Sequence, residues 1–227
     1  MKKFWIVIGI AALLFSAGCG KDSSSGPSGP TAAELTAEAW GYYDVNDYDN
    51  SLDKFNEAID KDGNYYEAYL GRAFTYLADP THFSDSLAAS DLESRIYANR
   101  TAIVNAGQEA TVLRPAYAAI LGYKIKSTTQ YSFVHTNLYT TLNNITLAWE
   151  FEHNNGDLEL NGPMVHLNLA EMYFYFPAAT DTHHSRAVAQ LTMVRNWAGY
   201  SGMPQYLKDK ADALYAQFVD SGGLIDK

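Results

Sequence analysis

The sequence predicts an all-α fold built from repeated helix pairs, and two observations support this. The apolar pattern of residues 35–43 recurs 34 residues later, and that period is typical of arrays of two-helix units. Near the end of the chain, apolar residues at i, i+4, i+7 and i+11 form one stripe of an amphipathic helix. The repeated positions are Leu35, Ala39, Trp40, Tyr42 and Tyr43, matched by Tyr69, Ala73, Phe74, Tyr76 and Leu77.

The composition fits a chain that buries a sizeable core. Its 227 residues are 47% hydrophobic and 14% aromatic, and only 19% are charged, which excludes an intrinsically disordered chain. Without Lys2 and Lys3, which belong to the leader described next, 14 basic residues stand against 26 acidic ones, a net charge of −12. Such a surface repels nucleic acid and gains nothing from anionic lipid headgroups, so we expect no nucleic-acid partner.

The first 18 residues have the order of a secretory signal. Lys2 and Lys3 precede an apolar run over 4–15, which is too short to span a bilayer comfortably, and Ser16-Ala17-Gly18-Cys19 follows. The end of this segment resembles a bacterial lipoprotein signal. The resemblance implies that residues 1–18 are removed and that Cys19, the only cysteine, becomes an acylated N-terminus. Several acyl chains would hold the protein stably on a membrane, and ordinary signal cleavage is the alternative.

Residues 19–30 are predicted to be a lipid-anchored linker. The stretch from Lys21 to Pro30 consists mostly of Ser, Gly and Pro and cannot bury a core. A chain of about a dozen such residues reaches about 20 Å on average, which would keep the folded domain close to the membrane. Gly20 is not an inner-membrane retention signal of the kind some bacteria use, which favours the outer membrane.

The first helix pair begins at Thr31, which forms a capping-box sequence with Glu34. Aromatic and small residues follow over 39–43, then a polar turn, then a second helix with small-x-x-x-aromatic-x-x-Ala spacing at Ser51, Phe55 and Ala58. This pattern resembles a tetratricopeptide repeat (TPR), although Ser51 replaces the usual Ala and Gly63 the usual Pro. The resemblance implies a right-handed α-solenoid of about four TPR-like helix pairs plus a C-terminal capping helix, over residues 31–222.

Later units follow the same pattern less regularly. Residues 67–77 predict the first helix of the second pair, with a weaker second helix over about 84–97. Pro115 predicts the start of a third unit and Pro163 that of a fourth. Residues 137–148 predict a helix of poor propensity, and the rival prediction is a β-hairpin with strands at 150–153 and 157–160. The capping helix carries Leu207, Ala211, Leu214 and Phe218.

The sequence contains no recognised catalytic or cofactor motif. It has no Gly-rich phosphate loop, His-Glu-x-x-His or Gly-x-Ser-x-Gly, so we expect no enzyme, no cofactor and no catalytic residue. Residues 60–64 begin like a calcium loop, but Tyr65 stands where the loop requires Gly, which favours a polar turn. His153 and His166 flank an Asn/Gly loop without an evident third ligand, so structural hydrogen bonds are favoured over a metal site.

The predicted binding residues form a second apolar stripe on the first helix of each of the first two units. One stripe is enough to pack a helix against its neighbours, and in the TPR family the second stripe lines the concave groove. The alternative is that later parts of the chain fold back and bury this stripe as core. The predicted groove residues are Trp40, Tyr43, Leu70, Phe74 and Leu77.

Two functions of different classes are compatible with these features. The first is a membrane-tethered, non-catalytic scaffold of the cell envelope that binds a protein or peptide segment in the groove, as repeat arrays do. The second is a binding lipoprotein that captures a small apolar or sugar-like ligand for a transport system. The segment from Trp149 to His153 also resembles a recurring join in TPR lipoproteins of Gram-negative bacteria. The fold alone does not choose between the two functions.

Overall fold

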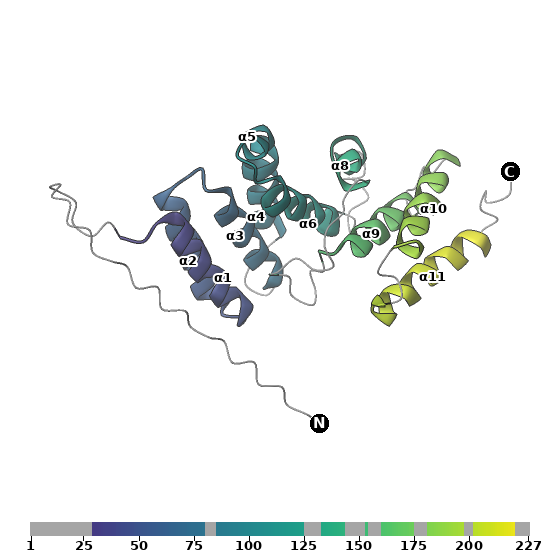
Figure 1. Ribbon diagram of the computed structural model, residues 1–227, viewed down its shortest axis with the longest axis horizontal. Coiled ribbons are helices and arrows are strands. Elements are labelled where there is room, and N and C mark those ends of the chain that lie inside the picture. Colours follow the sequence, from purple (N-terminus) through teal and green to yellow (C-terminus); the bar gives the residue numbers. More distant parts are fainter. Residues whose placement is uncertain are drawn as a thin grey trace, which may run out of the picture.

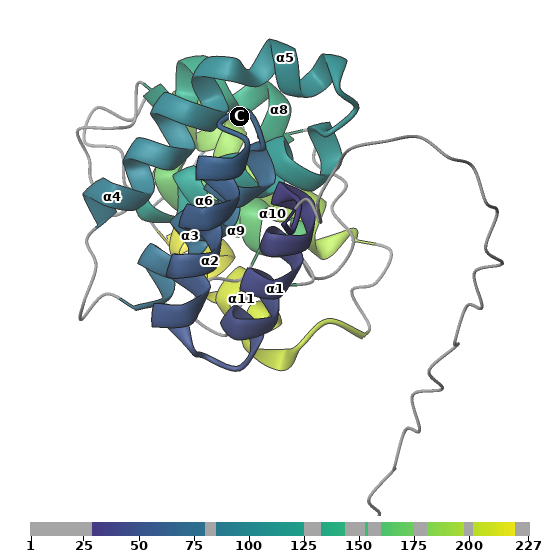
Figure 2. The ribbon, with the colours of Figure 1, turned by 90° about the vertical axis from the view of Figure 1, so that its left-hand side faces the viewer.

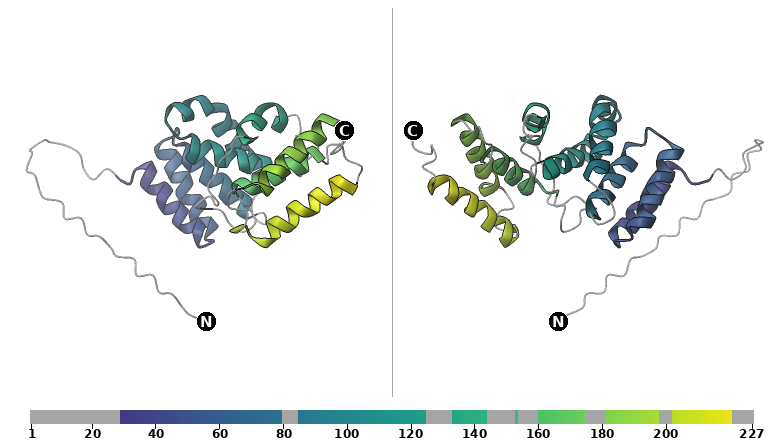
Figure 3. Two further views of the ribbon diagram at one scale, coloured as in Figure 1. Left: turned by 45° about the vertical axis from the view of Figure 1, so that its right-hand side comes forward. Right: turned by 180° about the vertical axis from the view of Figure 1, so that it is seen from behind.

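The computed structural model describes residues 29–79, 85–124, 133–143, 153, 160–174, 181–197 and 202–220. All regular secondary structure in these residues is helical, which confirms the predicted all-α class for this part of the chain. The helices follow one another in a curved array, with α1 and α2 at one end and α10 and α11 at the other (Figure 1, Figure 3). Leader residues 1–18, Cys19 and most of the linker lie outside the described residues.

The N-terminal helices form as the sequence predicts. In α1 (Ala32–Asp44) the Thr31 hydroxyl accepts a hydrogen bond from the Glu34 amide at 3.2 Å, and the Glu34 carboxylate accepts one from the Thr31 amide at 2.8 Å. Asn46 adopts a left-handed φ of 61° in the turn, and Asp47 caps α2 (Tyr48–Lys61). The two helices pack as an αα-hairpin, and α3 (Tyr66–Ala78) packs against both.

The middle of the array is less regular. Residues 85–105 form one helical run in which α4 (Asp85–Ala89) continues into the π-helical η1 (Ser90–Ile96), the 3-10 segment η2 (Tyr97–Asn99) and α5 (Arg100–Asn105). This run covers the predicted helix from residue 85 to 97, and residue 84 lies outside the described residues, but α5 was not predicted. A turn with Gly107 at φ 72° then leads into the π-helical η3 (Glu109–Leu113).

The third and fourth predicted units are present in part. Pro115 lies in the first turn of α6 (Arg114–Lys124), and η5 (Val134–Leu138) continues into α8 (Tyr139–Asn143). Helices α9 (Gly162–Phe174) and α10 (Asp181–Arg195) pack as a pair, and α11 (Gln205–Asp220) packs against both. The end of the predicted helix over 137–148 and nearly all of the rival β-hairpin lie outside the described residues.

The core follows the array from end to end. Predicted stripe residues Leu207, Ala211 and Leu214 of α11 are buried, as are the small residues Ala39, Ala58 and Ala73 at the N-terminal end. Gly71 of α3 lies directly against α2, because an added Cβ at this position would lie 2.0 Å from the Phe55 ring. Glycine is therefore needed at this position for its lack of a side chain.

We expect Gly71→Ala to lower the free energy of unfolding by about 1–3 kcal/mol, because the fully buried Phe55 ring must shift. Gly41→Ala in α1 is the matched control. Its Cβ would meet nothing within 4 Å, so it should raise stability by about 0.5–1 kcal/mol through helix propensity. Chemical denaturation of the two variants measures both changes. A gain in stability for Gly71→Ala would contradict the close approach of α2 and α3.

No helix among the described residues combines the length and the apolar character needed to cross a membrane.

Candidate functional site

The predicted groove residues lie in the interior, which corrects the expectation of an open surface. Trp40 and Tyr43 are only 4% and 3% exposed, and Leu70 and Phe74 are fully buried. Leu77 is partly buried and packs against the same core. The prediction of an exposed aromatic groove is therefore wrong for these side chains, and the alternative, ordinary core, describes them.

The contacts of Trp40 explain why the second stripe is buried. Its ring meets Phe55 of α2 and Phe74 of α3 edge-on, at centroid distances of 5.2 and 6.0 Å. Its indole N–H donates to the Glu67 carboxylate at 3.3 Å. Trp40 thus has partners on both α2 and α3, and both of these helices contact α1.

A residue far along the chain covers the remaining face of Trp40. The His153 ring stacks on the Trp40 ring at a centroid distance of 4.2 Å and an angle of 8°. Its Nδ1 lies 3.1 Å from a carboxylate oxygen of Asp44 at the end of α1. The His153 ring therefore covers a face of Trp40 that the TPR resemblance implied would be open to a partner.

His166 also has a structural role. It is buried, and its Nδ1 lies 2.6 Å from Oε1 of Gln190. The Nε2 group of Gln190 donates a hydrogen bond to Oδ1 of Asn143. The interpretation of His153 and His166 as hydrogen-bonded structural residues is therefore confirmed. Among the residues that the structure describes, no three His, Cys, Asp or Glu side chains lie close enough together to hold a metal ion.

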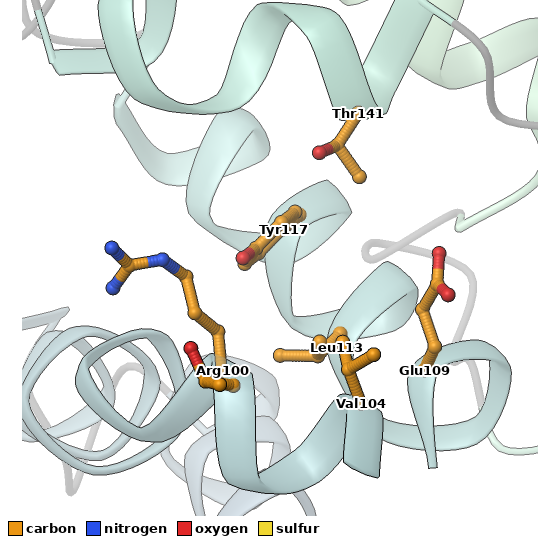
Figure 4. A pocket seen from close by; sticks show the side chains of 7 residues that line it. Arg100, Val104, Glu109, Leu113, Tyr117 and Thr141 are labelled. Atoms are coloured by element: carbon orange, nitrogen blue, oxygen red, sulfur yellow. The ribbon is translucent and has the colours of Figure 1, made fainter. Parts of the chain in front are cut away.

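A different region offers a cleft open to solvent. It has a volume of about 230 Å³ and lies between α5, η3, α6 and α8 (Figure 4). Helices α5 and α8 lie on one edge of the array, opposite α11 (Figure 1, Figure 2). We call it the Arg100–Glu109 cleft. Its lining residues are Arg100, Thr101, Val104, Glu109, Leu113, Tyr117 and Thr141.

Arg100 is held in place at one end of this cleft. Its Nη1 donates to the backbone carbonyl of Tyr97 at 3.0 Å, and the guanidinium lies 4.5 Å from the centroid of the Tyr97 ring. The rings of Tyr97 and Tyr117 also lie next to each other, with their centroids 5.8 Å apart. In the described part of the chain no carboxylate pairs with Arg100, so its other N–H groups remain available.

Glu109 lies on the other side of the cleft, with Tyr117 between the two charges (Figure 4). One Glu109 oxygen lies 3.6 Å from the Arg114 guanidinium. Tyr117 is 5% exposed, yet its hydroxyl makes no hydrogen bond within the part of the chain that the structure describes. The hydroxyl is protonated at neutral pH, as in any tyrosine, and burial raises the pKa of Tyr117 further, to about 12.

This cleft was hard to predict from the sequence. Its residues come from four elements, and two of these, α5 and η3, interrupt the repeat pattern where no helix was predicted. The available signal was local: Arg100 and Val104 share a helix face at i, i+4, as do Leu113 and Tyr117.

Comparison of the chain with protein-family models, with curated proteins and with solved structures finds no match.

Proposed function

We propose that this chain is a non-catalytic interaction scaffold of the bacterial cell envelope, anchored to the membrane by a lipid on Cys19. The described helices would belong to a right-handed α-solenoid of TPR-like pairs, with α11 as the capping helix. We infer no catalytic role, because the sequence contains no Gly-rich phosphate loop, His-Glu-x-x-His or Gly-x-Ser-x-Gly motif. The outer membrane is the favoured location because Gly20 follows the cysteine.

The observation that carries the proposal is the way in which the helices stack. Contacts run mainly between neighbours in the chain: α1 with α2, α2 with α3, α9 with α10, and α10 with α11. Alternate helices also touch, as α1 touches α3 and α9 touches α11. Repeat arrays have this nearest-neighbour pattern, and they serve as extended binding surfaces.

Charge indicates the chemistry of the partner. Residues 31–62 carry nine acidic and two basic side chains. Four of the acidic residues are exposed and follow one face of α2, at Asp49, Asp53, Glu57 and Asp60. Since the aromatic stripe is buried, we assign the partner contact to this exposed acidic face, and the partner would be a basic protein segment.

Crosslinking in the intact envelope tests this function. A photoreactive residue at Asp53 should give a discrete protein adduct, and one at exposed Met193 of α10 is the matched control. Changing the other three acidic residues to their amides should abolish the Asp53 adduct, and salt should weaken it. Equal yields of adduct from both positions would argue against the acidic face. So would an Asp53 adduct whose yield is unchanged by the amide substitutions and by salt.

The lipid anchor has its own test. Cys19→Ser should move the protein from the membrane fraction to the soluble fraction, because the leader can no longer be processed into an acylated terminus. Fractionation followed by immunoblotting measures the change, and radiolabelled palmitate should label the wild type alone. An unchanged membrane fraction in the variant would exclude the anchor and favour another mode of membrane association.

A second candidate is capture of a small ligand. The observation that favours it is the Arg100–Glu109 cleft, which is lined by a basic and an acidic side chain and by the apolar Val104 and Leu113. The same lipoprotein would then deliver its ligand to a transport system. Protection of the cleft from chemical modification by a candidate ligand would distinguish this function from pure scaffolding.

A further inference from the structure

We propose that the contact between His135 of η5 and Arg186 of α10 is an acid-sensitive switch. It holds η5 and α8 against α10 while the imidazole is neutral, and it loosens when the imidazole takes up a proton. The contact joins two parts of the array that are 51 residues apart in the chain. The inference does not depend on the identity of a partner or a ligand.

The geometry of the contact requires a neutral imidazole. Arg186 Nη1 lies 3.0 Å from Nδ1 and 3.1 Å from Nε2 of His135. A guanidinium group has only hydrogen-bond donors, so it needs an acceptor nitrogen on the ring, and only the neutral ring has one. A second proton removes that acceptor and places two cations in contact. Arg186 keeps its charge at every physiological pH, so the protonation of His135 decides whether the two groups attract or repel each other.

Two tyrosine rings hold the guanidinium in this position. It lies 5.2 Å from the centroid of the Tyr139 ring of α8 and 5.8 Å from that of the Tyr173 ring of α9. The two rings meet edge-on with their centroids 5.6 Å apart, and Tyr173 is fully buried. The contacts that the structure describes for Arg186 are with these rings and with His135, and none is with a carboxylate. A proton on His135 therefore meets a positive charge that no described carboxylate compensates.

The neighbouring helices bring further titratable groups to this region. The Tyr173 hydroxyl lies 3.2 Å from His135 Nδ1, and the Tyr139 ring lies 6.1 Å from the imidazole ring. Both phenols are neutral at physiological pH. The Glu171 carboxylate of α9 pairs with Lys210 of α11 at 3.3 Å. Further groups lie along α10, at His184 and Arg195, and along α6, at Arg114, Tyr117 and Tyr123. Of the charged groups named here, Arg186 is the one that contacts His135.

The switch acts on a short segment at the edge of the array (Figure 1). Its two elements, η5 and α8, have five residues each, and their apolar side chains Val134, Leu138 and Leu142 are buried. These apolar contacts do not depend on pH, so protonation should loosen the segment without unfolding the array. Thr141 of α8 lines the Arg100–Glu109 cleft, so the same movement changes one wall of that cleft.

Hydrogen exchange of the purified full-length chain tests the switch. Protection of the amides of residues 134–143 is measured at about pH 7.5 and about pH 5.5, after correction for the intrinsic pH dependence of exchange. A histidine with the ordinary pKa of about 6.5 in the open state, and no second proton in the closed state, lowers protection by about tenfold between these conditions. The amides of α2, which contains no histidine, are the internal control and should keep their protection.

Variants identify the two groups responsible. His135→Gln retains a hydrogen-bond acceptor that does not titrate, so the tenfold change should disappear. Arg186→Gln removes the opposing charge, so the change should be much smaller. His184→Gln is the matched control, because His184 lies on α10 two residues before Arg186 and is half-buried, as His135 is. It should keep the full response.

Nuclear magnetic resonance of labelled histidine gives a second measurement that does not require His135→Gln to fold. The His135 signal should titrate at a lower pH in the wild type than in Arg186→Gln, because removal of a neighbouring positive charge favours the second proton. High salt should reduce this difference. Equal titration in the two proteins would overturn the inference. Unchanged protection of residues 134–143 at low pH, or loss of the response in His184→Gln, would overturn it as well.

Discussion

Trp40→Ala should lower the free energy of unfolding by about 3–5 kcal/mol, the range for truncation of a large aromatic side chain in a core. Trp40 joins α1, α2 and α3 through its contacts with Phe55 and Phe74, and it also carries the stacked His153 ring. These partners cannot all close the space that the indole leaves. Denaturation by urea, followed by circular dichroism, measures the loss.

Controls decide whether this loss comes from burial. Val45→Ala lies five residues away in the turn after α1, where the side chain is 69% exposed, and it should change stability by less than about 0.5 kcal/mol. His153→Ala removes only the ring that stacks on Trp40, so it should lower the free energy of unfolding by less than Trp40→Ala does. Wild-type stability in Trp40→Ala would mean that the stripe is an open surface after all, and would restore the groove as a candidate partner site.

Asp91→Ala should lower the free energy of unfolding by about 3 kcal/mol, because it leaves the Arg72 guanidinium partly buried without its counter-ion. The two side chains form a bidentate pair, with Nε–Oδ2 at 2.8 Å and Nη2–Oδ1 at 2.7 Å, and Arg72 Nη1 donates to Asn56 at 2.8 Å. The expected loss is at the low end for a buried pair because Arg72 keeps 21% of its side chain exposed.

A double variant tests the cause of that loss. Arg72→Met/Asp91→Leu removes both charges, so it should be more stable than Asp91→Ala alone, and its stability relative to the single variants gives the coupling energy. Equal losses in the single and double variants would show that packing of α3 against η1, rather than the uncompensated charge, determines the effect. Chemical denaturation of all the variants under one buffer condition provides the comparison.

Some elements could be predicted because their causes are local. Thr31 and Glu34 are three residues apart and cap α1 through contacts with each other. Pro115 and Pro163 begin helices because proline suits the first turn, where its missing N–H has no partner in any case. The stripe from Leu207 to Leu214 follows from the helical period alone. Each of these features depends on neighbours within one or a few turns of the same helix.

Other elements escaped prediction because the repeat period is lost between residues 99 and 149. No apolar period marks α5 or η3, and the π-helical segments change the side-chain register that a period of 3.6 residues would give. The Arg72–Asp91 pair was missed for a related reason. Its members are 19 residues apart, and no sequence pattern predicts that the Asp91 carboxylate of η1 lies next to Arg72 of α3.

The sequence by itself determined that the described part of this chain is helical, where α1, α6 and α9 begin, and that α1 and α3 each carry two apolar stripes. Only the tertiary structure decided that Trp40, Tyr43, Leu70 and Phe74 are buried, because burial depends on what covers a side chain. Trp40 is covered in part by His153, 113 residues further along the chain. The Arg100–Glu109 cleft likewise arises where four separate elements meet without filling the space between them. Helix formation is set by local backbone and side-chain preferences, whereas covered and uncovered surface is set by long-range packing.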